Sequence, residues 1–469
     1  MPEKITITAH RAPEPLIALI KRLHFYIGVL VGPFLLVAAL SGILYASTPQ
    51  IESRLYDQAL HTDSQGLALS LEAQVRVAQA KVGGAAPVAA VRPAPAQGET
   101  TRVMFTIPGL GASEHRAIFV DPVNGQIRGD MTVYGTSGVL PLRTWIDQFH
   151  RGLMLGDIGR LYSELAASWL WVAALGGAIL WLSQRRKMSP KISIAAPKTA
   201  LRRLHTTTGL WLLIGLLFFS ATGLTWSQWA GGNIGVLRGY WGWSTPSVST
   251  ALGKPAQMSM PVVDEHAGHH MDMGAHKPSV LADLSLFDKA LARARAEKID
   301  AAKIEIRPAS DPDSAWVIRE IDGRWPTQVD AVSIDPDTLN IVDKVEFVSY
   351  PLAAKLTRWG IDAHMGVLFG LANQLVLVAF ASGLAVMVVL GYVMWWRRRP
   401  TRSRVTQRQP TLVDAWRLLN RKSRWLIAFM TVVCGLSLPV MGCSLLGLIA
   451  LDLLLSARRS SGALIEKRG

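Results

Sequence analysis

The sequence predicts a membrane α-helical bundle, built by internal duplication, with two small α+β domains outside the cytoplasm. Three observations predict it: long apolar segments without formal charge, polar segments between them with strand and hairpin patterns, and residues that recur at matched offsets in two halves of the chain. Of the 469 residues, 50% are hydrophobic and 18% are charged, and the mean hydropathy is +0.25. This composition is typical of a membrane protein with sizeable water-exposed parts.

Four apolar segments are long enough to cross a bilayer, which takes about 20 residues at 1.5 Å rise each. The charge-free runs are 23–46, 165–184, 204–230 and 365–396. The first is too long for the apolar core of a signal peptide, so we expect a retained helix. A fifth apolar segment, 425–457, is interrupted by Pro439 and predicts a broken or re-entrant pair of short helices.

These segments predict the order of domains along the chain. The predicted order is span 1 (15–46), a first extracytoplasmic α+β domain (47–141), an outer histidine segment with span 2 (142–184), a cytoplasmic link (185–203), span 3 (204–230), a second extracytoplasmic region with an α+β domain (231–350), an outer histidine segment with span 4 (351–396), a basic cytoplasmic link (397–424) and a C-terminal membrane segment (425–457).

The formal net charge of +15 indicates orientation. Lys and Arg gather before span 1, between spans 2 and 3, and after span 4, so the positive-inside rule places these segments and the N-terminus in the cytoplasm. Nucleic-acid binding is the competing explanation of the pI of about 10. The basic residues lie at helix ends rather than on one soluble domain, so we expect membrane lipid and no nucleic acid as a partner.

Four histidines lie at the ends of the four spans as two matched pairs. His24 and His205 each follow Arg-Leu, and His150 and His364 each follow a tryptophan by five residues. Other residues recur at the same offsets: Ser41 with Thr222, Gly42 with Gly223, Gly152 with Gly366, Gly156 with Gly370, Gly177 with Gly391, Trp181 with Trp395, and Arg185 with Arg399.

Ionisable side chains at membrane depth are costly and mark functional sites. Four that recur in register suggest bound metal, and haem iron above all, since neutral imidazole is a common axial ligand. His24 and His205 share the cytoplasmic side, and His150 and His364 share the outer side, so we expect one haem for each pair. The alternative is that these histidines line the membrane interface and the nearby glycines serve close helix packing.

The outer histidines lie well before the charge-free part of their spans. A straight helix would carry His150 about 20 Å beyond the apolar core. Glycines after each histidine predict a bend that brings it back: Gly152, Gly156 and Gly159 in the first half, and Gly366 and Gly370 in the second. Three arginines are candidate partners for haem propionates, with lipid headgroups as the alternative: Arg143, Arg151 and Arg358.

The two outer segments carry the same order of signals. Residues 69–82 and 285–298 predict amphipathic helices, and alternating strands follow each of them. A hairpin turn begins with Asp121-Pro122 in the first segment and Asp335-Pro336 in the second.

The Arg-Leu-His spans, the Trp-x4-His-x-Gly segments and the repeated Asp-Pro hairpins resemble the PepSY-associated transmembrane family over roughly residues 15–400. Some members are bacterial inner-membrane siderophore reductases with two b-type haems. The resemblance implies PepSY-like domains in the periplasm, two haems b ligated at His24, His150, His205 and His364, and reduction of a ferric siderophore. The second hairpin departs from the first, since Leu339-Asn340 replaces Gly125-Gln126.

Two axial histidines leave haem iron without an open position, which suits electron transfer. The sequence lacks nicotinamide, flavin and nucleotide motifs, so a reductase would take electrons from a quinol or a cytoplasmic flavoprotein. The resemblance therefore implies that the protein is a ferric-chelate reductase. The alternative from another class is a membrane-anchored interaction module whose outer domains bind a periplasmic partner.

A second candidate metal site is a loop rich in histidine and methionine. Imidazole and thioether ligands suit copper, so the loop predicts metal handling as a third alternative. Its histidines are His266, His269, His270 and His276.

Overall fold

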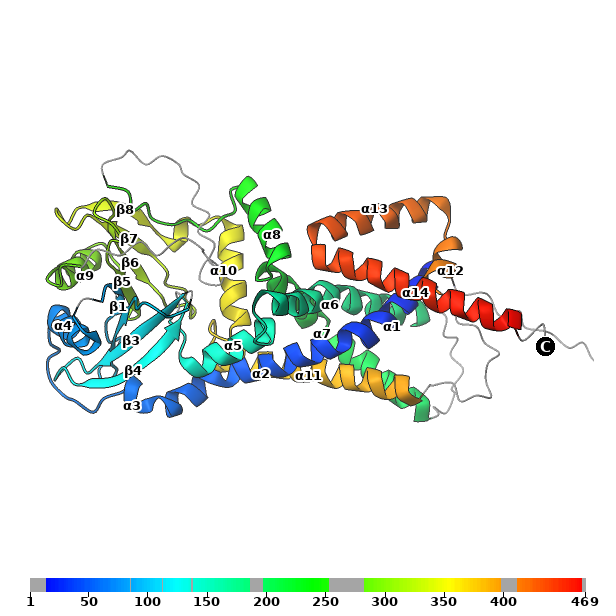
Figure 1. Ribbon diagram of the computed structural model, residues 1–469, viewed down its shortest axis with the longest axis horizontal. Helices are drawn as coiled ribbons and strands as arrows, with labels where there is room; N and C mark the ends of the chain where they lie inside the picture. The colour runs from blue at the N-terminus through cyan, green and yellow to red at the C-terminus, as the bar shows by residue number, and fades with distance from the viewer. Residues whose placement is uncertain are drawn as a thin grey trace, which may run out of the picture. The chain divides into compact units, whose positions relative to one another are not determined.

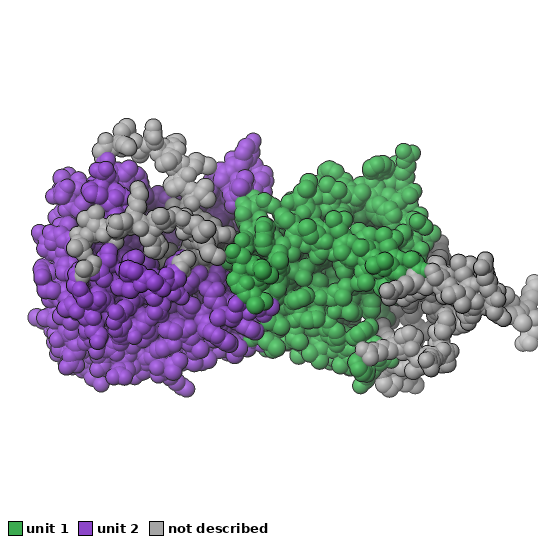
Figure 2. Space-filling model, viewed as in Figure 1, with its two compact units in different colours: residues 1–40, 155–233, 379–469 green, residues 41–154, 234–378 purple. Residues whose placement is uncertain are grey.

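The computed structural model describes residues 14–84, 86–111, 113–135, 138–185, 197–252, 282–397 and 411–465. The chain forms two compact units (Figure 2). Unit 1 comprises residues 1–40, 155–233 and 379–469, and unit 2 comprises residues 41–154 and 234–378.

Five helices within the described part of the chain are long and apolar enough to cross a membrane. Four of them lie where the sequence predicts spans, and the fifth lies in the C-terminal segment. They are Pro15–Leu55, Gly156–Arg185, Ala200–Thr225, Leu371–Arg397 and Pro439–Ala457.

These spans belong to α1 (Pro15–Tyr26), a π-helical turn (Ile27–Val31), α2 (Gly32–Leu55), α6 (Gly156–Arg185), α7 (Pro197–Thr225), α11 (Leu371–Arg397) and α14 (Pro439–Ile465) (Figure 1). The first helix runs to Leu55, beyond the predicted end of span 1, and α7 ends at Thr225, before the predicted end of span 3. A separate helix, α8 (Trp229–Tyr240), follows it.

The π-helical turn in the first span begins three residues after His24, and its cause is local. Pro33 has no amide hydrogen to donate four residues back, which leaves the carbonyl of Val29 without its helical partner. The hydroxyl of Tyr392 donates to that carbonyl at 2.6 Å. A Cβ at Gly32 would lie 3.2 Å from the Tyr392 ring, so the glycine lets the ring approach. Pro33 and Tyr392 together account for the irregular turn.

The C-terminal apolar segment is broken where the sequence predicts. α12 (Leu412–Arg417) precedes α13 (Arg421–Ser437), and Leu438 separates α13 from α14, which begins with Pro439. A Cβ at Gly442 would lie 2.8 Å from the Gly435 carbonyl oxygen, so the two helices meet closely at glycines. α14 is by itself long enough to span, which the expectation of short helices did not anticipate.

Breaks also follow the two outer histidines, as the sequence predicts. α5 (Pro141–Gly152) is followed by Leu153 and Met154 with φ of 51° and 60°, and α6 then begins. α10 (Leu352–His364) is followed by Gly366 and Gly370 with φ of 76° and 56°, and α11 then begins. In the first repeat, non-glycine residues therefore adopt the left-handed conformation that favours glycine.

The outer segments form one sheet. Its eight strands lie in the order β4-β3-β2-β1-β5-β6-β7-β8, and each neighbouring pair is antiparallel. The strands are β1 (Val88–Arg92), β2 (Thr101–Phe105), β3 (Glu114–Val120), β4 (Ile127–Tyr134), β5 (Ile304–Arg307), β6 (Trp316–Glu320), β7 (Ala331–Ile334) and β8 (Ile341–Val345). Short helices flank it: α3 (Asp57–Leu60) and the 3-10 turn η2 (Phe347–Ser349).

The two predicted α+β units share this one sheet. Each repeat does supply four strands, but β1 of the first pairs with β5 of the second, with Val91 opposite Ile306. The reason is that each half-sheet has an edge strand with unpaired backbone groups, and the two edges satisfy each other.

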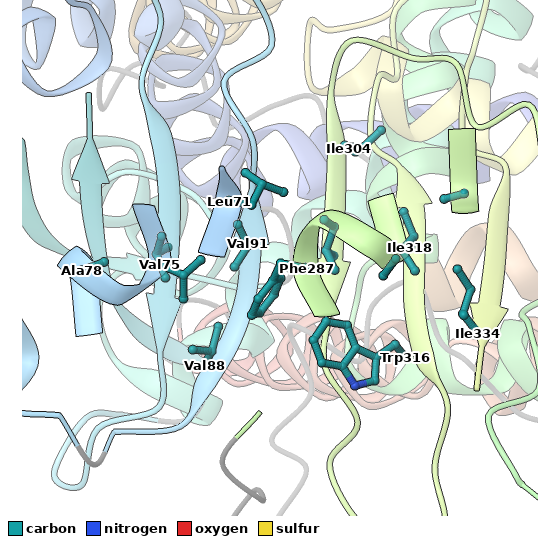
Figure 3. Close-up of a cluster of buried hydrophobic side chains, with 14 of the residues drawn as sticks. Leu71, Val75, Ala78, Val88, Val91, Phe287, Ile304, Trp316, Ile318 and Ile334 are labelled. Atoms are coloured by element: carbon teal, nitrogen blue, oxygen red, sulfur yellow. The ribbon is translucent and has the colours of Figure 1, made fainter. Parts of the chain in front are cut away.

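One hydrophobic core lies under both repeats. α4 (Leu71–Val82) and α9 (Leu286–Ala296) cover the same face of the sheet, and their apolar side chains pack with alternate residues of the strands (Figure 3). The rings of Phe287 and Trp316 lie 4.8 Å apart. The carboxylate of Asp288 on α9 accepts hydrogen bonds from the amides of Leu71 and Glu72, at the N-terminus of α4. The repeats are thus joined through the sheet and through the helices.

The two hairpin turns are alike despite their different residues. Asp121 accepts a hydrogen bond from the amide of Val123, and Asp335 accepts one from the amide of Asp337. Gly125 has φ of 73°, and Leu339 takes the same place with φ of 58°. The departure in sequence is therefore absorbed as backbone strain at Leu339 rather than as a different turn.

Candidate functional site

The imidazole rings of His24 on α1 and His205 on α7 lie close together within unit 1. Their ring centroids are 6.4 Å apart, and the ring planes are inclined at 83°. The Nδ1 atom of His24 lies 3.1 Å from the carbonyl oxygen of Ala173 on α6, and that of His205 lies 3.1 Å from the carbonyl of Met387 on α11. Because a carbonyl only accepts, Nδ1 carries the proton in each ring. Nε2 is then the nitrogen with a lone pair for a metal.

The carbonyl acceptors follow the internal duplication. Ala173 comes 23 residues after His150, and Met387 comes 23 residues after His364. Each inner histidine is therefore oriented by the span that follows the outer histidine of its own repeat. Three positions recur in each repeat, namely the inner histidine, the outer histidine and the acceptor carbonyl, and this makes incidental histidines at the interface a poor explanation.

Small residues let the neighbouring helix approach His24. A Cβ at Gly177 would lie 3.3 Å from the His24 Cε1 atom, and one at Gly176 would lie 3.9 Å from Nδ1. The counterpart of Gly177 in the second repeat, Gly391, has nothing within 4 Å of such a Cβ. Close approach to the histidine ring therefore requires glycine at position 177, whereas position 391 could accommodate a side chain.

The inner pair fits an iron bound between two imidazoles. Metal bonds of about 2.0–2.1 Å to each nitrogen would hold the ring centres roughly 6 Å apart, close to the observed separation. Each ring also donates its other N–H to an oxygen, the usual way in which a protein fixes a ligating histidine. Both rings are only partly buried, although they face other helices.

His150 on α5 and His364 at the end of α10 belong to unit 2. The Nδ1 atom of His150 lies 2.9 Å from the hydroxyl oxygen of Ser41, which is 1% exposed. A Cβ at Gly42 would lie 3.5 Å from the His150 Cε1 atom, an ordinary contact. The repeated Ser41-Gly42 pair thus orients and accommodates an outer histidine.

His150 and His364 are close enough to interact electrostatically. Removal from water and, to a smaller extent, the charge of His150 together lower the pKa of the His364 imidazole to about 3. His364 is therefore neutral at physiological pH, which is the form that binds metal.

The three arginines that the sequence offers as propionate partners have protein partners. Arg143 lies 3.2 Å from the carboxylate of Glu52, and Arg358 lies 2.8 Å from that of Asp362. Arg151 lies 2.8 Å from the carboxylate of Asp147, but its buried NH1 nitrogen makes no hydrogen bond. Of the three, Arg151 has the donor left for a further anion.

Within the described ranges, three or more His, Cys, Asp or Glu never gather as a possible metal cage. Bis-histidine ligation of haem needs only two such residues. His266, His269, His270 and His276 lie outside the described residues.

Backbone acceptors at Ala173 and Met387 have no side-chain signature, so sequence reasoning missed them. The offset of 23 residues was present in the duplication, but it becomes informative only once α6 is known to face α1.

The fold and these pairs define a class: membrane proteins whose apolar helices carry paired histidines. The family model described as PepSY-associated TM region matches residues 21–398, more than half of the chain. The protein belongs to this family, as the Arg-Leu-His spans predict. A comparison with curated proteins found no match.

Proposed function

We propose that the protein is a di-haem b electron-transfer protein of the bacterial inner membrane that reduces ferric iron in siderophores on the periplasmic side. The observation that carries the proposal is the inner pair: two imidazoles 6.4 Å apart, each held through Nδ1 by a carbonyl at the duplicated position.

His24 and His205 would hold one haem and His150 and His364 the other. Haem would supply one-electron transfer at these residues, and ligation by two histidines would leave no position for oxygen. The carbonyls of Ala173 and Met387 fix the tautomer and direction of the inner imidazoles, whereas the Ser41 hydroxyl, which can donate or accept, orients the His150 ring only. These contacts reduce reorganisation of the ligands when charge changes.

The acceptor would meet unit 2, because the predicted orientation places the sheet outside the cytoplasm. One electron converts a ferric chelate to a ferrous one, and the lower charge weakens the hold of hard oxygen ligands. A quinol or a cytoplasmic flavoprotein would supply that electron. The N-terminus and the two basic links, 185–203 and 397–424, would lie in the cytoplasm.

The first test is haem content and ligand pairing. Purified protein should contain about two haems b per chain, with low-spin spectra. His24→Ala and His205→Ala should remove the same haem, while His150→Ala and His364→Ala should remove the other. His61→Ala is the matched control, since His61 is exposed and pairs with Asp57 at 2.8 Å. Protein without haem after haem-replete expression contradicts the proposal.

The second test concerns the acceptor. Dithionite-reduced protein should be reoxidised by one or more ferric siderophores, and the variant lacking all four histidines should not support this reaction. Indifference to every ferric chelate would leave electron transfer intact but remove iron as the acceptor. A pure interaction module would keep its cellular activity in the fourfold variant.

A further inference from the structure

The face of the sheet opposite α4 and α9 carries a row of arginines. Arg102 on β2 lies opposite Arg92 on β1, and Glu305 on β5 lies opposite Arg319 on β6. Since Val91 pairs with Ile306, Arg92 and Glu305 are neighbours across the junction of the two repeats. Arg307, two residues from Glu305, lies on the same face. We call these four arginines (Arg92, Arg102, Arg307 and Arg319) the arginine face.

One carboxylate serves most of the arginine face. Glu305 is fully buried and lies 2.5 Å from Arg92, 2.7 Å from Arg307 and 2.7 Å from Arg319. Arg102 instead donates to the carbonyl oxygen of Gly138 at 2.6 Å and lies over the ring of Phe119. Four positive charges therefore face one negative charge.

Neighbouring elements do not cancel this excess. Arg358 on α10 is close enough to Arg319 to lower its pKa, after the larger effect of burial. Arg143 on α5 acts likewise on Arg102, and Glu52 opposes it. Arg143 and Arg358 are each paired with one carboxylate: Arg143 with Glu52, and Arg358 with Asp362. Asp343 on β8 lies on the same face, because Ser333 pairs with both Val317 and Asp343. Among the described residues, positive charges on this face therefore still exceed negative charges by two.

Such an excess is costly where water is partly removed. Burial and, after it, the charge of Arg92 lower the pKa of Arg102 to about 9. An anion on this face would relieve the repulsion. The face is also accessible, because the side chains of Arg307 and Arg319 are 36% and 32% exposed.

The arrangement discriminates between anions. Arg92, Arg307 and Arg319 surround the carboxylate of Glu305, and Arg102 lies one strand further along, so the positive groups spread over β2, β1, β5 and β6 around an occupied centre instead of surrounding an empty point. A guanidinium fork matches a carboxylate in two-point contact. A compact phosphate would reach one or two of these residues, whereas several carboxylates on one molecule would match this spread.

We propose that the arginine face binds a small polycarboxylate. The inference rests on the sheet alone, and it deepens the proposed function by assigning a negative charge to the ferric chelate that the protein would reduce. A chelate with free carboxylates would be held on unit 2, the unit that also contains His150 and His364.

The test is binding of citrate to the full-length protein in detergent, measured by calorimetry at two salt concentrations. Citrate should bind, and more weakly at the higher salt, because charge attraction carries the affinity. Arg307→Gln and Arg319→Gln should each weaken binding at least tenfold. Arg76→Gln is the control: Arg76 lies on α4, on the opposite face, and pairs with Glu72 at 2.6 Å. The affinity of the Arg76→Gln variant for citrate should stay unchanged.

Absence of citrate binding by the unaltered protein would overturn the inference, as would equal affinities for the two variants and the control. Circular dichroism and thermal unfolding of each variant show that it is folded. Haem content and reoxidation by uncharged ferric siderophores are measured separately. Failure of citrate binding would leave those results untouched, and failure of haem binding would leave the polycarboxylate site standing.

Discussion

At the scale of single residues, the duplication provides pairs of equivalent positions. Comparing the two members of a pair distinguishes contacts that are specific to one histidine from packing common to both repeats. His24 and His205 each donate from Nδ1 to a backbone carbonyl. Of the equivalent glycines Gly177 and Gly391, only Gly177 lies close to a histidine ring, that of His24. Equivalent substitutions at equivalent positions therefore have different expected consequences.

Gly177→Ala should disturb the inner histidine pair, whereas Gly391→Ala should not. The added Cβ would lie 3.3 Å from the His24 ring in the first case and meets nothing within 4 Å in the second. Both changes favour the helix by roughly 0.5–1 kcal/mol, so this effect cancels in the comparison. The measurement, made in both glycine variants, is the absorption spectrum and midpoint potential of the haem proposed to be held by His24 and His205. Equal values for the two glycine variants would contradict the assigned packing.

Gly125→Ala should lower the free energy of unfolding by about 1 kcal/mol. Gly125 has φ of 73°, a conformation that costs a side chain roughly 1–2 kcal/mol. The new Cβ would be 3.5 Å from Leu69, so sterics add little. Leu339→Gly relieves strain in the second hairpin but loses the packing of Leu339 on the core, so it should be nearly neutral. Thermal unfolding of both variants checks this, and a larger loss for Leu339→Gly would mean that packing outweighs strain.

Residue types and offsets were enough to predict that His24 lies near His205, that His150 lies near His364, and that the chain bends beyond the outer two. They did not predict Leu153 and Met154 in left-handed conformations, because neither side chain favours that backbone. The partners of the histidines could be predicted only in part. Ser41 is a polar side chain in the duplication, whereas the carbonyl of Ala173 exists at every residue and becomes specific only through packing.

At the scale of elements, the junction of β1 with β5 converts two half-sheets into one. β1 escaped prediction because Val88–Arg92 is short, is rich in alanine and lies between Pro87 and Pro93. Its place is decided by tertiary pairing, which overrides weak strand propensity. The helices and the later hairpins were predictable because their periodicity and turn residues are local.

Glu305→Gln should destabilise this junction by about 3–5 kcal/mol, the usual effect of removing one partner from a buried ion pair. Asp130→Asn is the control, since the more exposed Arg116–Asp130 pair should contribute at most about 1 kcal/mol. A similar loss in both variants, measured by thermal unfolding, would contradict a special role for Glu305.

The same carboxylate predicts a pH dependence. Burial would raise the pKa of Glu305, but Arg92, Arg319 and Arg307 outweigh it and hold the pKa below its ordinary value. The ion pairs therefore stabilise the protein fully above the unfolded pKa of about 4.3, and this contribution declines as the pH falls below it. Unfolding midpoints of the unaltered protein should fall more steeply below about pH 4.3 than those of Glu305→Gln. Parallel profiles would exclude Glu305 as the source.

At the scale of the whole molecule, each compact unit contains one histidine pair, and each pair takes one histidine from each repeat. The duplicated chain thus forms two histidine pairs by exchange between repeats, rather than one pair within each. The family match ends at residue 398, but the helices that follow belong to unit 1 and pack against its other helices. Trp169 on α6 donates to the hydroxyl of Ser444 at 2.9 Å, and Asn233 donates to the carbonyl of Ser437 at 3.0 Å.

Asp452 on α14 is the residue through which these C-terminal helices are fixed to the first span. It is fully buried, accepts hydrogen bonds from the hydroxyl of Tyr26 and the amide of Leu412, and lies 3.7 Å from Arg22. Arg22 and Tyr26 each lie two residues from His24. A carboxylate at this depth is costly unless it is paired, so its partners must be in place together.

Asp452→Ala should therefore release α12 and lower the free energy of unfolding by about 3 kcal/mol, because it leaves Arg22 without its buried partner. Ser444→Ala removes one neutral hydrogen bond to the same helix and should cost about 1 kcal/mol. Release of α12 exposes the bond after Arg417 to trypsin. Since about 1.4 kcal/mol corresponds to a factor of ten in an equilibrium, native-state cleavage there should accelerate more than tenfold in Asp452→Ala and distinctly less in Ser444→Ala. Equal cleavage rates in the two variants would mean that α12 is held by apolar packing alone, and that the buried carboxylate does not tie the C-terminal helices to the span that carries His24.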